Sequence, residues 1–263
     1  MFEDLLEVET GIRFAPARVE AVKPLTPHMI RITLKSELIR GFSDTVAGAH
    51  FKLVVPTKDQ SVGDFIKYVA QQNYKSEMRT YTIRNVRPAI GELDVDIVVH
   101  GDLGRVGPWA QRTRPGDGIV ISICGAPKLI TESATRIVAA ADLTGFPALA
   151  AGLETLDAGI DVSVYVEIPS DGDRQPLNVP DGVDVNWIVK TDPKAPADEM
   201  LQAIRGLPEP DQTTSIFVAG EFSMVADLRR YFLRELKTEK SMAYISSYWR
   251  AGLIEPDHSL QSQ

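Results

Sequence analysis

Residues 78–84 have the sequence Met-Arg-Thr-Tyr-Thr-Ile-Arg, in which β-branched and aromatic residues alternate as in an edge strand or a barrel strand. The guanidinium of Arg79 is a planar fork of donors that suits a diphosphate. The ring of Tyr81 suits packing beside an aromatic cofactor, and the Thr82 hydroxyl can donate to a ring nitrogen or a carbonyl. The same letters also fit an ordinary exposed strand, so the stretch alone leaves both interpretations open.

Short strand-like segments without long helices surround this stretch in the first half of the chain. They lie at residues 17–22, 29–34, 50–55, 79–86, 92–100 and 119–123. A loose or helical lead-in is expected before residue 16, a break at 24–27 and a short helix at 109–112. Residues 59–77 read as a long surface excursion of the kind that is often functional. The pattern predicts an antiparallel, six-stranded β-barrel over residues 1–130.

The second half of the chain has a different pattern, with apolar strands that alternate with helices. Strands are predicted at residues 136–141, 161–166, 185–189, 214–219 and 243–247, and helices at 146–156, 197–204 and 224–236. Apolar strands alternating with helices are typical of a parallel sheet that is covered on both faces. We therefore predict an α/β domain over residues 131–263.

Charge and composition exclude several classes of function. The net charge of −8 argues against nucleic acid as a partner, and the lack of a long apolar run argues against membrane insertion. The acidic N-terminus does not look like a signal peptide, so we expect a cytoplasmic protein. Cys124, the single cysteine, cannot hold an iron–sulfur cluster, and the four scattered histidines show no metal-ligand spacing. Residues 52–87 are locally basic, which can steer an anionic ligand or simply mark a solvated loop.

A glycine-rich stretch follows the predicted strand at 92–100. Residues 100–110 read His-Gly-Asp-Leu-Gly-Arg-Val-Gly-Pro-Trp-Ala. Glycines let a backbone approach a phosphate, and the start of a helix favours an anion. Taken alone, the stretch also fits a plain turn. Together with Arg79, it could hold one diphosphate.

The order and spacing of these motifs resemble those of the siderophore-interacting proteins, FAD-dependent ferric-siderophore reductases of the ferredoxin-reductase-like superfamily. Arg-x-Tyr-Thr at 79–82 is similar to the flavin-binding motif of that superfamily. The likeness extends over Ala49–Pro56, Arg79–Thr82, Asp96–Ala110, Ala140–Pro147, Ala219–Glu221 and Tyr248–Arg250. The resemblance implies that the barrel binds FAD and that the α/β domain binds NAD(P)H.

The resemblance also implies cofactor contacts in both domains. In the first domain they are Arg79, Thr80, Tyr81, Thr82, Val99, His100, Gly101, Gly104, Val106, Gly107 and Trp109. In the second they are Asp142, Thr144 and Pro147 near the adenosine of FAD, Gly220 and Glu221 on the pyridine-nucleotide side, and Trp249 over the flavin. Asp142 or Thr144 can instead cap a helix, and Trp249 can instead pack in the core.

The chain departs from the family pattern at one point in the glycine-rich stretch. Arg105, Val106 and Gly107 stand where Pro-Ala-Ser is usual. The hydroxyl missing at Gly107 puts one phosphate contact in question. Arg105 could supply a charge-assisted hydrogen bond in its place.

The expected activity follows from the implied cofactor. NAD(P)H would reduce FAD, and FAD would reduce Fe(III) in a siderophore, with no catalytic residue or metal site of the protein's own. Lys52, Lys75, Arg84 and Arg250 are the candidates for binding the anionic ferric chelate. A flavin or quinone reductase of the same fold remains an alternative. So does a non-enzymatic, flavin-carrying siderophore-binding protein fed by a ferredoxin, because the chain has no G-x-G-x-x-G fingerprint.

Overall fold

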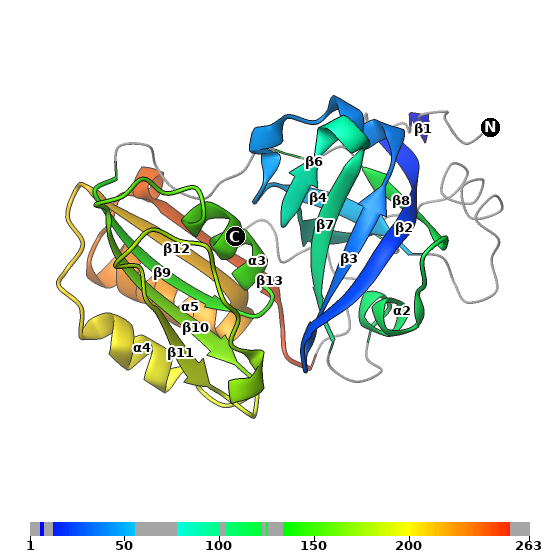
Figure 1. Cartoon of the computed structure of the whole chain (residues 1–263). Coiled ribbons are helices and arrows are strands. Elements are labelled where there is room, and N and C mark those ends of the chain that lie inside the picture. Colours follow the sequence, from blue (N-terminus) through cyan, green and yellow to red (C-terminus); the bar gives the residue numbers. More distant parts are fainter. Residues whose placement is uncertain are drawn as a thin grey trace. The chain divides into compact units, whose positions relative to one another are not determined.

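The chain divides into two compact units. A computed structural model describes residues 6–7, 13–55, 78–99, 104–122, 125 and 134–252. The first unit comprises Met1–Pro127 and Ile254–Pro256, and the second comprises Lys128–Leu253 and Asp257–Gln263. The first contains an antiparallel sheet and the second a parallel one (Figure 1).

The first unit is built from short antiparallel strands. Their order in the sheet is β5-β4-β8-β2-β3-β7-β6, with β1 paired to β2. The described strands are β1 (Leu6–Glu7), β2 (Arg13–Thr26), β3 (Met29–Lys35), β4 (His50–Val54), β5 (Met78–Thr82), β6 (Asn85–Arg87), β7 (Glu92–Val98) and β8 (Gly118–Ser122). The helical elements are η1 (Glu37–Gly41), η2 (Asp44–Val46), η4 (Pro88–Ile90) and α2 (Val106–Arg112).

The two ends of this sheet are joined by one continuous segment, because β5 runs into β6 through Ile83 and Arg84. The Ile83 N–H donates to the Ala49 carbonyl at 2.9 Å, and the Arg84 N–H donates to the Asp94 carbonyl at 2.8 Å. The segment therefore pairs with β4 at its start and with β7 at its end, which closes the sheet. If β5 and β6 count as one interrupted strand, the described strands other than β1 form the six-stranded barrel that was predicted.

The first strand of the barrel is longer than predicted. β2 begins at Arg13, inside the expected lead-in, and continues through Pro24 to Thr26. Pro24 is tolerated because β8 pairs with β2 only as far as Arg18, while β3 alone continues beside it, with a shift of register between Pro24 and Thr26. A proline costs no ladder hydrogen bond when its position faces a free edge. The predicted break at 24–27 is therefore wrong for residues 24–26, and the turn between β2 and β3 is limited to Pro27 and His28.

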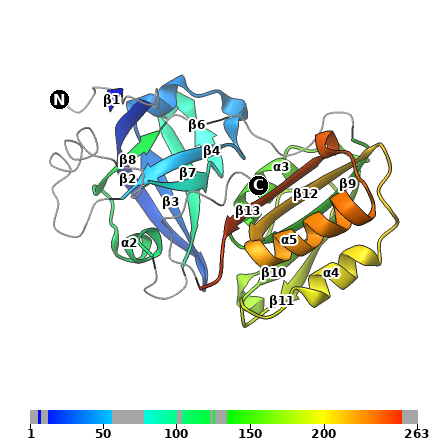
Figure 2. The same cartoon turned by 180° about the vertical axis from the view of Figure 1, so that it is seen from behind.

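The second unit is a five-stranded parallel sheet, with the order β11-β10-β9-β12-β13 among the described residues. Helix α3 covers one face, and α4 and α5 cover the other (Figures 1 and 2). The strands are β9 (Arg136–Asp142), β10 (Asp161–Ile168), β11 (Val185–Val189), β12 (Thr214–Glu221) and β13 (Ala243–Trp249). The helices are α3 (Phe146–Leu153), η5 (Asp171–Asp173), α4 (Asp198–Arg205), α5 (Phe222–Arg230), the π-helix η6 (Tyr231–Glu235) and η7 (Lys240–Met242).

Each unit has its own apolar core. The barrel interior holds Phe51, Leu53 and Ile97, which are at most 1% exposed. In the second unit every residue of β12 is buried, as expected for a central strand between two helical layers. The predicted fold class, an antiparallel barrel followed by a parallel α/β sheet, is confirmed.

Some predicted features fall outside the described residues. They are the excursion at 59–77 and the residues Lys75, His100, Gly101 and Cys124. Within the described ranges, no helix is both long enough and apolar enough to span a membrane. The same ranges contain no group of three or more His, Cys, Asp or Glu side chains arranged to hold a metal ion.

Candidate functional site

In the barrel, the Arg-x-Tyr-Thr motif lies on β5 beside β4. The register pairs Lys52 with Thr80 and Leu53 with Arg79. Residues that face each other across antiparallel strands share a face, and neighbours along a strand alternate. Arg79 and Tyr81 therefore project from one face of β5, while Thr80 projects from the other face with Lys52. The Lys52 Nζ donates to the Thr80 hydroxyl.

The side chains of this motif fit a flavin nucleotide in their chemistry. The Arg79 guanidinium is half-buried and donates to the Met78 carbonyl at 2.9 Å. Tyr81 packs partly buried against the apolar core, and Thr82 is 8% exposed. A guanidinium can bind a diphosphate, and a tyrosine ring and a threonine hydroxyl can contact an aromatic ring system.

Helix α2 follows the glycine-rich stretch and begins at Val106, three residues earlier than predicted. The side chains of Val106 and Trp109 are buried in the barrel core, which is a structural role. Gly104 is exposed and has φ of +79°, a conformation that favours glycine. At Gly107, an added Cβ would lie 3.7 Å from the Val98 carbonyl oxygen, an ordinary contact distance. This turn therefore has room for a small side chain.

Val99, the last described residue before this stretch, is 6% exposed. Its N–H donates to the His28 carbonyl at 2.9 Å, which extends the pairing of β3 and β7 beyond Val98. The backbone that leads into residues 100–103 is thus fixed to the barrel wall.

In the second unit, Asp142 joins three chain segments at the carboxyl edge of the sheet. Its Oδ1 accepts from the Thr144 N–H at 2.7 Å, from the Thr144 hydroxyl at 2.6 Å and from the Gly145 N–H at 3.2 Å. Its Oδ2 accepts from the Glu221 N–H at 2.8 Å and from the Trp249 Nε1 at 2.6 Å. The structure therefore brings four predicted site residues together around one carboxylate. The contacts with Thr144 and Gly145 form a turn that leads into α3, and the N-cap residue of that helix, Gly145, has no side-chain cap bond.

Glu221 ends β12 and caps α5. Its carboxylate accepts from the N–H and hydroxyl of Ser223 and, at 3.1 Å, from the Ala251 N–H. Burial alone would raise the pKa of the Glu221 carboxyl, but these hydrogen bonds outweigh burial and hold the pKa below its usual value. The carboxylate is therefore anionic at neutral pH.

Gly220 lies at a close approach between β12 and Asp142. Its φ is +153°, and an added Cβ would lie 2.7 Å from the Asp142 carboxyl carbon and 2.8 Å from the Met224 methyl group. Only glycine fits there. Pro147 is buried in the first turn of α3, a position that suits proline because a helix start needs no N–H partner.

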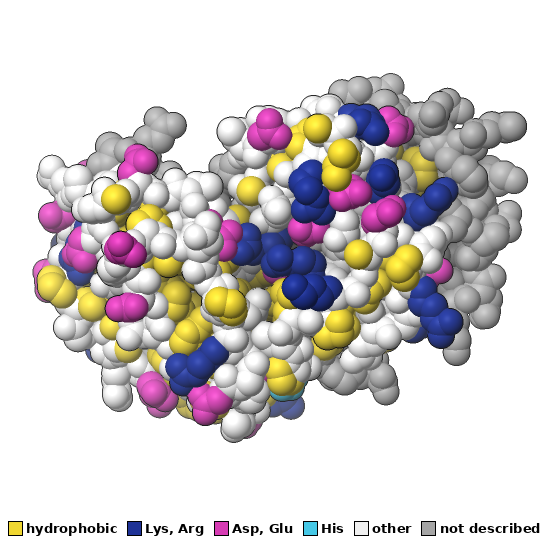
Figure 3. Space-filling model, in the orientation of Figure 1, with side chains coloured by type: hydrophobic (Ala, Val, Ile, Leu, Met, Phe, Trp, Pro, Cys, Tyr) yellow, Lys and Arg dark blue, Asp and Glu magenta, His cyan; other side chains and the backbone are white. Residues whose placement is uncertain are grey.

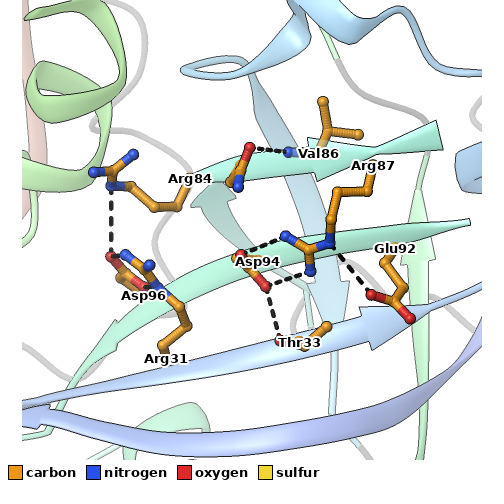
Figure 4. A network of polar contacts seen from close by, with 9 residues as sticks. Arg31, Thr33, Arg84, Val86, Arg87, Glu92, Asp94 and Asp96 are labelled. Atoms are coloured by element: carbon orange, nitrogen blue, oxygen red, sulfur yellow. Dashed lines mark hydrogen bonds and ion pairs between the residues drawn. The ribbon is translucent and has the colours of Figure 1, made fainter. Parts of the chain in front are cut away.

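The candidates for binding an anionic chelate have partners in the structure. The Arg84 side chain is 11% exposed, and its Nε lies 3.8 Å from Asp96 Oδ2 (Figure 4). Arg31 holds the same carboxylate with two bonds, at 2.7 and 2.8 Å. The Arg250 guanidinium lies 4.6 Å from the centre of the Phe222 ring, a cation–π contact.

A second group of ion pairs lies beside the first on strands β3, β6 and β7. Asp94 accepts from the Arg87 guanidinium at 2.8 and 2.9 Å and from the Thr33 hydroxyl at 2.7 Å, and Arg87 also reaches Glu92 at 3.3 Å (Figure 4). Figure 3 shows basic and acidic side chains next to one another on the face of the barrel unit. Their charges compensate each other there.

The sequence analysis missed Glu167, which stands opposite Asp142 in the register of β10 and β9. Glu167 is 6% exposed, and its Oε2 lies 3.2 Å from the Lys190 Nζ. Burial raises the pKa of the Glu167 carboxyl, Lys190 opposes the rise, and the charges of Asp142 and Glu221 add to it. An acidic residue next to the last position of a strand in a parallel sheet was the signal in the sequence.

Comparisons with known proteins cover both units. A family model described as "Siderophore-interacting FAD-binding domain" matches residues 18–128, and one described as "Siderophore-interacting protein" matches residues 134–252. Among curated relatives, the ferric vibriobactin reductase ViuB of Vibrio cholerae is 29% identical over 242 residues, which cover 89% of this chain and 88% of ViuB.

Solved structures give the same relationship. The siderophore-interacting protein SipS from Aeromonas hydrophila has a TM-score of 0.80 and 29% identity, and the match covers 92% of this chain and 93% of SipS. A ferredoxin reductase in carbazole 1,9a-dioxygenase, with a TM-score of 0.64 and 17% identity over 90% of this chain and 70% of its own, shares the fold alone. With both units matched in order, this chain belongs to the siderophore-interacting protein family, and its cofactor is FAD.

Proposed function

We propose that the chain is an oxidoreductase that takes electrons from NAD(P)H and reduces Fe(III) in a siderophore. The observation that carries the proposal is the pairing of Arg79 and Tyr81 on one face of β5, on a barrel whose family binds FAD. The name of ViuB, a ferric vibriobactin reductase that aligns with this chain over most of both lengths, supports the substrate class.

On this proposal the barrel residues bind and orient the flavin. Arg79 neutralises the diphosphate and Tyr81 packs beside the ring system, both from one face of β5. Thr82 lies on the other face by alternation, so its hydroxyl contact with the ring stays a prediction. FAD held by these residues would supply hydride acceptance from NAD(P)H and one-electron donation to the acceptor, a balance of one NAD(P)H to two ferric ions. The ferrous product binds hard oxygen ligands less tightly, which favours release of the iron from the siderophore.

Each unit has one cationic side chain that is a separate candidate for binding the anionic ferric chelate. Lys52 lies on the exposed side of β4 with Thr80, and Arg250 follows the last strand of the second unit. Arg84 is the weaker candidate, because the buried carboxylate of Asp96 already compensates its charge. Lys75 lies outside the described residues, so its contact with the ferric chelate stays a prediction.

An anaerobic absorbance titration of the purified protein tests the activity. Flavin bands should bleach on addition of NADH or NADPH and return on addition of a ferric siderophore, at one NAD(P)H for two ferric ions. If the flavin bands do not change with either nucleotide but bleach with a reduced ferredoxin, NAD(P)H is not the electron donor. Bands that return with quinone but not with ferric siderophore would refute the acceptor.

The substitution Arg79→Ala tests the flavin site itself. Loss of the charge-assisted bonds to a diphosphate should weaken FAD binding by about a hundredfold, since such bonds contribute roughly 1.5–3 kcal/mol each. Arg114→Ala is the matched control, because Arg114 is an exposed arginine of the same unit. An Arg79→Ala protein that holds FAD as tightly as the control would contradict the proposed site.

A further inference from the structure

The end of β10 occupies a defined position in the second unit. The strands are in the order β11-β10-β9-β12-β13. The chain adds β10 and β11 on one side of β9 and adds β12 and β13 on the other side. An open parallel sheet forms its ligand crevice at the carboxyl edge where this order changes, which here is between β9 and β12. In sheets of this kind the adenosine ribose of a dinucleotide lies toward the second strand, which here is β10. An acidic residue there binds the 2′-hydroxyl of NAD, whereas an arginine accommodates the 2′-phosphate of NADP.

Glu167 is the residue that this strand presents at its carboxyl end. It shares a face of the sheet with Asp142, its register partner on β9. Lys190, which directly follows β11, holds the carboxylate at 3.2 Å, and both side chains are nearly buried, with 6% and 12% exposed. A 2′-phosphate that used the Lys190 ammonium would compete with Glu167 for its positive charge, and drawing it away from a nearly buried carboxylate is costly.

The charges around this pair also oppose an additional phosphate. Asp142 and Glu221 both raise the pKa of Glu167, so their charges act on the same edge of the sheet. Within residues 161–174 the one cation is Arg174, and its guanidinium is bound to Asp171 at 2.7 and 3.0 Å. The loop also carries Asp173. The carboxylates of Asp142, Glu167 and Glu221 outnumber the one ammonium of Lys190 at this edge, so it favours a neutral ribose hydroxyl over a phosphate.

We infer that Glu167 makes the chain select NADH over NADPH, by accepting from the ribose 2′-hydroxyl and by holding Lys190 away from a 2′-phosphate. This inference rests on the proposed function, in which a pyridine nucleotide is the donor. It concerns the adenosine half of that nucleotide, which the second unit binds at its own carboxyl edge. Glu167 is thus a specificity-determining residue of the donor site.

Calorimetric titration of the full chain with ADP-ribose and with 2′-phospho-ADP-ribose tests the inference without any turnover. The parent should bind ADP-ribose at least about tenfold more tightly, because a like charge at this edge opposes the phosphate. Glu167→Gln, which keeps the shape and frees Lys190, should reduce this ratio about tenfold or invert it. Glu235→Gln, which removes an exposed carboxylate from the same unit, should leave the ratio unchanged.

Three other outcomes would each overturn a different statement. Tighter binding of 2′-phospho-ADP-ribose by the parent would overturn the inference and leave the proposed function standing. If Arg174→Ala then lost that tighter binding, Arg174 would be the residue that contacts the phosphate. An unchanged ratio in a folded Glu167→Gln protein would overturn the role of Glu167. If the parent binds neither probe, the pyridine nucleotide is not the donor, and the inference fails together with that part of the proposed function.

Discussion

Gly107 is the residue at which this chain departs from the family pattern in the glycine-rich stretch. An added Cβ would lie at an ordinary 3.7 Å from the Val98 carbonyl oxygen, so the turn can accept a serine without strain. If the usual serine hydroxyl contacts a phosphate of FAD, Gly107→Ser should lower the dissociation constant for FAD about tenfold, the value of one hydrogen bond to a charged group. Equilibrium dialysis or flavin fluorescence measures the change.

Gly107→Ala is the matched control for that substitution. It adds the same Cβ without the hydroxyl, so FAD affinity should stay at the level of the parent. Equal tightening in both variants would show that the gain comes from a stiffer backbone rather than from a hydrogen bond. In that case Arg105, at the start of α2, keeps its predicted place as the compensating contact.

Asp142 shows how far single residues could be predicted from the sequence. Its spacing to Thr144 indicates a local contact, and the structure contains that contact as a turn before α3, whose N-cap Gly145 has no side-chain cap bond. Its bond to Trp249 spans 107 positions, and its bond to the Glu221 N–H spans 79. No local pattern carries such contacts, because they arise only when β9, β12 and β13 become neighbours in one sheet. These bonds do not involve a ligand, so the contact of Asp142 with FAD stays a prediction.

At the scale of elements, the Asp94 carboxylate joins β3, β6 and β7 where the barrel closes. It is 8% exposed and accepts two bonds from Arg87 and one from Thr33. In Asp94→Asn an amide N–H would point at the Arg87 guanidinium, so the variant should lose about 3 kcal/mol of unfolding free energy. Glu37→Gln, which removes an exposed ion pair with Arg40, should cost less than about 1 kcal/mol. Urea unfolding measures both.

Because Asp94 is ionised when it binds Arg87, we expect the unfolding free energy of the barrel to depend on pH. Burial would raise the pKa of Asp94, but the bonds from Arg87 and Thr33 outweigh burial and hold it below its ordinary value of 3.8. A carboxyl whose pKa is lower in the folded state stabilises the fold above its unfolded value, and this contribution is lost as the pH falls through the folded pKa. The difference in unfolding free energy between the parent and Asp94→Asn should therefore be constant from about pH 7 to 5 and shrink below about 3.8. A difference that persists unchanged in acid would contradict the ionic origin of the effect.

The elements themselves were largely predictable, and the errors share one cause. Alternation and apolar runs located the described strands other than β1, because a strand's two faces are dictated by its own residues. The passage of β2 through Pro24 depends on which edge of β2 is paired there, and that is set by β3 and β8. The change from α5 to a π-helix at Tyr231–Glu235 likewise has no signal in the local pattern. Such features are determined by neighbours in space.

At the scale of the whole molecule, the chain consists of two units with separate cores. The barrel interior and the layer between the parallel sheet and helices α4 and α5 are distinct clusters of buried residues. A ligand that binds only the folded state stabilises the unit that binds it by mass action. Because most of the predicted FAD contacts, Arg79 and Tyr81 among them, lie on the barrel, FAD should stabilise the first unit more than the second.

Hydrogen exchange with and without FAD measures this difference directly. With FAD at about a hundredfold its dissociation constant, barrel amides that exchange by global opening should slow about a hundredfold, while core amides of β9 and β12 should change little. ADP-ribose in place of FAD should reverse the pattern, since its proposed site is the carboxyl edge of the second sheet. Equal protection of both cores by FAD would contradict the combination of a site confined to the barrel and two units that open independently.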